Sequence, residues 1–113
     1  PKALDIQAMN AAAAFLTGCH DFKAFSSVKR TKKSTVRELY SVEVLRHEGQ
    51  VWMRFHGNGF LYNMVRIMAG TLIEIGTGER RPEDVKNILE SRDRQMAGVT
   101  APACGLCLMK VEY

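Results

Sequence analysis

The sequence has few cysteines and no long apolar run, and each shortage excludes a class of protein. Three cysteines in 113 residues are too few, and odd in number, for a disulfide framework, which favours a reducing compartment. No apolar stretch reaches the roughly 20 residues of a membrane-spanning helix, since the most apolar one, residues 60–75, contains Asn63, Arg66 and Glu74. The first residues lack the layout of a signal peptide. We therefore expect a cytoplasmic protein that does not enter a membrane.

Cys104 and Cys107 have the C-x-x-C spacing that is common in zinc and redox sites. They fall in a predicted strand, residues 103–112, where side chains three apart point to opposite faces. No second pair of ligands is spaced to complete a zinc site. We therefore expect no metal in this chain.

The net charge of +4 is moderate, but the basic residues are unevenly distributed. Residues 29–37 carry five of them and no acid. A solvated surface loop and a loop that contacts phosphates would both have this composition. Composition leaves these two interpretations equally open.

At 46% hydrophobic, the chain has enough apolar material for one domain with a single core, residues 1–113. Helical periodicity, strand alternation and turn residues predict its elements. They are a helix that ends at Gly18, a β-hairpin, a second helix that ends at Gly76 and Gly78, a short third helix and a last strand. The first helix spans residues 5–17, and the two hairpin strands span 35–46 and 51–56. The second helix spans 60–75, the third 82–91, and the last strand 103–112.

Alternation along the strands predicts which side chains share a face. In the first hairpin strand, Val36, Tyr40, Val42 and Val44 share one face, and Leu39 lies on the other. The second strand alternates in the same way. The last strand has apolar residues on both faces, so we expect it in the interior of a sheet.

This order of elements indicates an α+β fold with a mostly antiparallel sheet packed on helices. It matches a ferredoxin-like β-α-β-β-α-β unit whose first strand is missing. A strand upstream of Pro1 would complete the unit, or another part of the sheet must cover that edge. We therefore interpret the chain as part of a longer protein.

Arg66 is a cation on a strongly apolar helix, and a guanidinium cannot lose its charge to escape burial. One interpretation is that its stem packs on the core while its head reaches water. The other interpretation is that Arg66 has a charged partner. Gly70 lies on the same predicted stripe as Tyr62, Asn63 and Arg66, and the helix follows the glycine-containing residues 57–59. These glycines favour close approach by another backbone or a ligand. The residues alone do not decide between them.

Asp21 stands beside His20, yet adjacent side chains usually diverge, so the pair does not specify a catalytic site. We expect Asp21 to stabilise a loop or cap. We also expect Phe22 and Phe25 in the core rather than stacked on bases.

Four stretches together resemble the C-terminal half of the bacterial tRNA pseudouridine synthase A (TruA) family, and they are spread along most of the chain, from residue 20 to residue 106. They are residues 20–25, 33–37, 57–70 and 97–103 with Gly105-Leu106. The resemblance implies an RRM-like pseudouridine synthase subdomain. The family isomerises uridine to pseudouridine in the anticodon stem-loop of tRNA, without cofactor or metal, as a homodimer.

The resemblance also implies roles for particular residues. The family's nucleophilic aspartate lies in a G-R-T-D-type motif that this sequence lacks, so the chain alone should be inactive. Arg66 would form an ion pair with that aspartate, supplied by the N-terminal half. Residues 60–63 (Phe60, Leu61, Tyr62 and Asn63) would form a wall of the active site. RNA contacts would come from Ser26, Ser27, Val28, Lys29 and Arg30, supported by Lys32, Lys33 and Arg37.

Two alternatives stay open from the sequence. A non-enzymatic ferredoxin-like RNA-binding module would use aromatic stacking and a basic loop. It lacks the aromatic, glycine-rich strand typical of such modules and leaves Arg66 unexplained. A structural or dimerisation domain would make the basic loop incidental.

Overall fold

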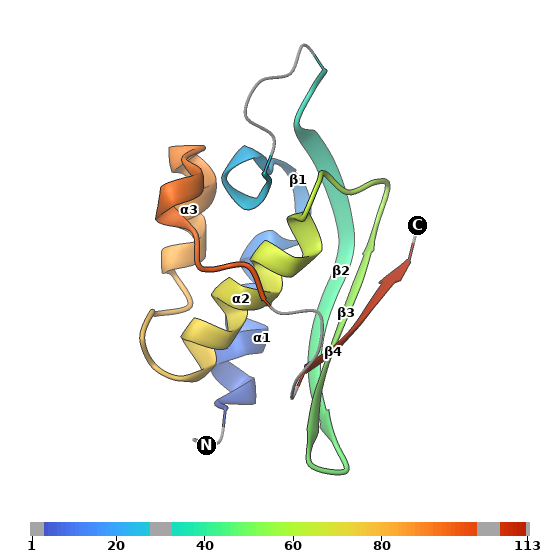
Figure 1. Ribbon diagram of the computed structural model, residues 1–113, viewed down its shortest axis with the longest axis vertical. Helices are drawn as coiled ribbons and strands as arrows, with labels where there is room; N and C mark the ends of the chain where they lie inside the picture. The colour runs from blue at the N-terminus through green and yellow to red at the C-terminus, as the bar shows by residue number, and fades with distance from the viewer. Residues whose placement is uncertain (1–3, 28–32, 102–106, 113) are drawn as a thin grey trace.

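The computed structural model describes residues 4–27, 33–101 and 107–112. Its sheet has the strand order β1-β2-β3-β4, with β1 at Gly18–Asp21, β2 at Val36–His47, β3 at Gln50–Gly57 and β4 at Cys107–Glu112. β1 and β3 run antiparallel to β2, and β4 runs parallel to β3. The helices lie on one side of this sheet (Figure 1). The predicted α+β fold with a mostly antiparallel sheet is therefore confirmed.

Helix α1 (Ile6–Leu16) forms where the apolar period predicts a helix. The Asp5 side chain caps its start by accepting a hydrogen bond from the Ala8 N–H at 3.0 Å. After the helix, Gly18 has a φ of 109°, which favours glycine and lets the chain turn into β1. β1 itself is a short strand that the sequence patterns did not predict.

A bulge in β2 changes the face that each side chain occupies. Leu39 pairs with Gly57, but Ser41 pairs with His56, so Tyr40 is an extra residue in the strand. Leu39 is buried while Tyr40 is 50% exposed, and Val36 on the near side of the bulge is also exposed. The predicted shared face is therefore wrong for Val36, Tyr40 and Leu39, because strict alternation assumes a strand without a bulge.

Helix α1 protects the open edge of β2. β1 pairs only with the Val36–Leu39 part of that strand. Further along, the Asn10 side chain donates to the Val44 carbonyl oxygen at 2.7 Å and accepts from the Val44 N–H at 2.9 Å. One side chain thus satisfies both backbone groups of an edge residue, which blocks pairing by another strand there.

Helix α2 (Met64–Gly76) begins four residues later than the sequence predicts. Asn63 adopts a left-handed conformation (φ 59°, ψ 8°), which asparagine tolerates better than most residues and which a helix interior cannot contain. The preceding residues form a turn closed by a 3.0 Å hydrogen bond from the Met64 N–H to the Leu61 carbonyl oxygen. The predicted helical stripe shared by Tyr62, Asn63 and Arg66 is therefore wrong. Tyr62 and Asn63 lie in the loop that precedes the helix.

The third helix, α3 (Asp84–Ser91), follows a turn at Pro82. A short 3-10 turn, η2 (Arg94–Met96), connects it to the segment before β4. Within the described sheet, β4 pairs with β3 alone and lies at an edge, so the predicted interior position is not met there. No helix in the described ranges is long and apolar enough to cross a membrane.

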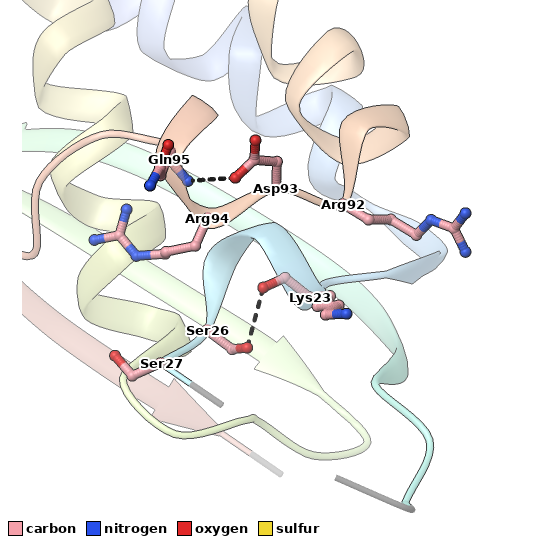
Figure 2. A pocket seen from close by; sticks show the side chains of 7 residues that line it. All are labelled: Lys23, Ser26, Ser27, Arg92, Asp93, Arg94 and Gln95. Carbon is pink, nitrogen blue, oxygen red and sulfur yellow. Dashed lines mark hydrogen bonds between the residues drawn. The ribbon is translucent and has the colours of Figure 1, made fainter. Parts of the chain in front are cut away.

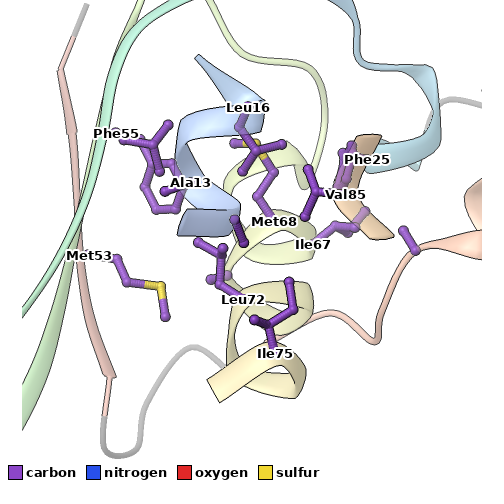
Figure 3. Close-up of a cluster of buried hydrophobic side chains, with 14 of the residues drawn as sticks. Ala13, Leu16, Phe25, Met53, Phe55, Ile67, Met68, Leu72, Ile75 and Val85 are labelled. Atoms are coloured by element: carbon purple, nitrogen blue, oxygen red, sulfur yellow. The ribbon is translucent and has the colours of Figure 1, made fainter. Parts of the chain in front are cut away.

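The core fills the space between α1, α2 and the inner face of the sheet (Figure 3). Met53 and Phe55 of β3 are fully buried, as alternation predicts. Phe22 precedes the 3-10 turn η1 (Lys23–Phe25) and Phe25 is its last residue, and both side chains are fully buried. Their predicted role in the core is confirmed, and they are not available to stack on bases.

Candidate functional site

Arg66 lies in the first turn of α2, partly buried, and the backbone of Ala101 holds it in place. Its Nε donates to the Ala101 carbonyl oxygen at 2.9 Å, and the Ala101 N–H donates to the Arg66 carbonyl oxygen at 2.9 Å. Among the residues that the structure describes, its two terminal guanidinium nitrogens have no hydrogen-bond or ion-pair partner. The side chain is therefore oriented at Nε and can offer both terminal nitrogens to one acceptor.

Residues 96–101, which we call the covering segment, run across α2 in close contact with its backbone. A Cβ on Gly70 would overlap the carbonyl oxygen of Val99. One residue earlier, the Gly98 N–H donates to the buried Thr71 hydroxyl at 2.9 Å, and a Cβ on Gly98 would overlap the Glu74 carboxylate. The close approach predicted at Gly70 is confirmed, and its partner is the backbone of Val99.

Two arginines fasten the covering segment. Arg80 binds Glu74 through Nε at 2.8 Å and donates to the Met96 carbonyl oxygen at 2.7 Å. Arg94 donates to the Gly98 carbonyl oxygen at 2.9 Å. Sequence reasoning missed both roles, because Arg80, Arg94 and Gly98 lie outside the α-helices and strands, where no regular period predicts neighbours. The segment that orients Arg66 is itself held at several points.

The loop that leads to α2 is tied back to β2. The Asn58 N–H donates to the Glu38 carbonyl oxygen at 3.0 Å, and the Asn58 side chain accepts from the Glu38 N–H at 2.9 Å. A Cβ on Gly57 would lie 2.8 Å from the backbone carbonyl oxygen of Glu38. Glycine is therefore required at this crossing, and the loop enters the site at a fixed place.

The turn at residues 60–63 brings the predicted wall against the predicted RNA-contact segment. Phe60 and Leu61 are partly buried against the core, whereas Tyr62 is 71% exposed. The Ser27 N–H donates to the Tyr62 carbonyl oxygen at 3.0 Å, and the Asn63 side chain donates to the Ser27 hydroxyl at 3.2 Å. Two segments that are far apart in sequence thus form one continuous surface beside Arg66.

The remaining RNA-contact candidates differ in accessibility. Ser26 is 1% exposed and its hydroxyl donates to the Lys23 carbonyl oxygen at 3.1 Å, so Ser27 is the more accessible serine. Lys33 is exposed. Arg37 donates to the carbonyl oxygens of Ser34 and Val36, at 2.9 and 2.7 Å. Four candidates lie outside the described residues: Val28, Lys29, Arg30 and Lys32.

Asp21 stabilises the loop that precedes β2, as predicted. Its Oδ1 accepts hydrogen bonds from the Thr35 hydroxyl at 2.6 Å and from the Lys23 N–H at 3.0 Å. In the described ranges, no group of three or more His, Cys, Asp or Glu side chains could hold a metal ion. Cys19 is exposed, and Cys104 lies outside the described residues.

Comparisons with known proteins agree with the resemblance noted from the sequence. The model of the tRNA pseudouridine synthase family matches residues 12–113. The tRNA pseudouridine synthase A of Syntrophotalea carbinolica is 51% identical over 110 residues, which are 97% of this chain and 44% of that protein. The enzyme of the same name from Geobacillus kaustophilus is 49% identical over 113 residues, which are 100% of this chain and 44% of that protein.

A third relative, from Brevibacillus brevis, is 48% identical over 110 residues and 45% of its length is covered. The chain therefore spans less than half the length of these relatives. Because the family model covers most of the chain and the identity is close to one residue in two, this chain belongs to the tRNA pseudouridine synthase family.

Proposed function

We propose that this chain is the C-terminal half of a tRNA pseudouridine synthase that isomerises uridine to pseudouridine in the anticodon stem-loop of tRNA. Family membership and the share of the relatives that it covers support this assignment. In this proposal residues 1–113 form one domain, and the N-terminal half supplies the catalytic aspartate. The isolated chain is then inactive, and the complete protein acts in the cytoplasm as a homodimer without metal or cofactor.

The observation that carries the proposal is the geometry of Arg66. Its Nε is occupied by the Ala101 carbonyl oxygen, and both terminal nitrogens lack a partner among the described residues. A guanidinium can bind a carboxylate through two parallel N–H···O bonds, which also fixes the direction of the carboxylate. Such a pair lowers the carboxylate pKa and keeps the nucleophile ionised.

RNA reaches this site, in our proposal, over the surface formed by Ser27, Tyr62 and Asn63. Phosphates are neutralised there by the cations of the basic stretch 29–37, which are Lys29, Arg30, Lys32, Lys33 and Arg37. The target base is stacked in the stem-loop, so it has to flip out before an aspartate can reach it. Tyr62 and the partly buried Phe60 and Leu61 then form one wall of the pocket that receives it.

The test uses the full-length protein, meaning this chain joined to its N-terminal half, with Arg66→Ala. Removing one partner of a buried ion pair strands the other charge at a cost of ~3–5 kcal/mol. We expect pseudouridine formation in a single turnover to fall by at least about a hundredfold, which is ~2.7 kcal/mol. Affinity for tRNA should stay within a few-fold of wild type.

Arg54→Ala serves as the control, because Arg54 is an exposed arginine on β3, next to the inward-facing Met53 and Phe55. That variant should keep the wild-type rate. A near-normal single-turnover rate for Arg66→Ala would reject the assigned role of Arg66.

A further inference from the structure

A groove of about 550 Å³ lies between the 3-10 turn η1 and the chain that follows α3 (Figure 2). One side is formed by Lys23 and the two serines that follow the turn, and the other by residues 92–95. The two sides are about 70 positions apart in sequence, so no sequence pattern predicts the groove. Ser26 and Ser27 were RNA-contact candidates from the sequence, whereas Lys23 and residues 92–95 were not part of any site inferred from it.

The groove carries more positive than negative charge. Three cations, Lys23, Arg92 and Arg94, face one carboxylate, Asp93. Arg94 is engaged, since it donates to the carbonyl oxygen of Gly98. The side chains of Lys23 and Arg92 are exposed and have no hydrogen-bond or ion-pair partner among the described residues. Two cations are therefore available to an anion at this place.

Arg92 stands in a backbone conformation that favours glycine. It ends α3 with a φ of 52° and a ψ of 28°, in the left-handed region where a helix most often ends on glycine. A residue with a Cβ is strained there, so glycine at this position would keep the backbone conformation and remove only the side chain.

Hydrogen-bonding groups accompany the two cations. The Ser27 hydroxyl accepts a hydrogen bond from Asn63, which leaves its own hydrogen free to donate to a phosphate oxygen. Asp93 uses Oδ1 to accept from the Gln95 N–H at 2.9 Å, and its Oδ2 has no partner among the described residues. That oxygen can accept a hydrogen bond from a ribose 2′-hydroxyl, which a free phosphate or an acidic peptide lacks.

We propose that this groove binds the ribose–phosphate backbone of the tRNA substrate through Lys23 and Arg92, next to the Ser27–Asn63 edge of the candidate active site. The identity of the RNA rests on the proposed function. Cations that contact phosphates position an RNA without reading its sequence. The groove would therefore hold a part of the tRNA while the target uridine enters beside Arg66.

The test measures binding of an unmodified tRNA transcript to the full-length protein as a function of KCl concentration. The double variant Lys23→Glu with Arg92→Glu should bind about tenfold or more weakly, and the slope of log K against log [KCl] should fall by about two. The double variant Arg81→Glu with Lys86→Glu makes the same change in net charge at two exposed cations outside the groove, and it should change the affinity much less.

Arg92→Gly separates binding from folding. Glycine relieves the left-handed strain, so the melting temperature should stay or rise while tRNA affinity falls and the slope decreases by about one. Wild-type affinity and slope in both groove variants would overturn the proposal. Absence of pseudouridine formation by the wild-type protein would instead reject the proposed function, so the two failures are distinguishable.

Discussion

At the scale of single residues, the site depends on Gly70, which allows close backbone contact, and on Arg66, whose side chain is oriented by a hydrogen bond. Gly70 lets the Val99 carbonyl group lie directly on α2. One turn earlier on the same helix, Arg66 exchanges hydrogen bonds with Ala101, two residues after Val99. The position of the guanidinium is therefore set by how closely the covering segment approaches the helix.

Gly70→Ala should displace the covering segment, because backbone atoms cannot yield as a flexible side chain does. We expect a loss of about 1–3 kcal/mol in the free energy of unfolding, as for other overpacked sites. Pseudouridine formation by the full-length protein should fall as well, since Ala101 would no longer orient Arg66.

Gly59→Ala is the matched control, because its Cβ would meet Arg37 Nε at an ordinary 3.4 Å. Chemical denaturation of both variants measures the difference. Equal stabilities would show that the covering segment does not lie as close to α2 as described.

At the scale of elements, α1 acts as a cover for the edge of β2 as well as a core helix. Its Asn10 takes the place of a neighbouring strand at Val44. The arrangement is needed because β1 is short and ends its pairing at Leu39.

Asn10→Ala should destabilise the protein by about 1–2 kcal/mol, because it removes both hydrogen bonds to Val44 and leaves two backbone groups at an edge that water partly reaches. Gln7→Ala, at an exposed position on the same helix, should stay within about 0.5 kcal/mol of wild type. Urea denaturation can measure both. An Asn10→Ala variant as stable as Gln7→Ala would show that the edge needs no cover.

Local patterns predicted the elements better than their details. The apolar period located α1, and alternation located the hairpin, because both follow from residues close in sequence. The bulge at Tyr40 and the left-handed Asn63 escaped prediction, since each depends on how a segment fits its neighbours. Likewise, Gly70 indicated close approach, but only the fold could identify Val99 as the partner. Only the fold could show that Lys23 and Arg92 line the same groove.

At the scale of the whole molecule, two features bear on the proposal that this chain carries one part of a site. Arg66 has an oriented head and no acid among its described neighbours. β4 has a strand on only one side within the described sheet. Both features agree with a second half that supplies a carboxylate and covers the edge of the sheet, as proposed above.

The most direct measurement of this account is pseudouridine formation in an unmodified tRNA transcript, comparing the chain alone with the full-length protein at equal concentration. We predict that the full-length protein converts uridine in the anticodon stem-loop. The chain alone should form no pseudouridine, because in our proposal the nucleophile belongs to the other half. Turnover by the chain alone, or no conversion by the full-length protein, would contradict the account.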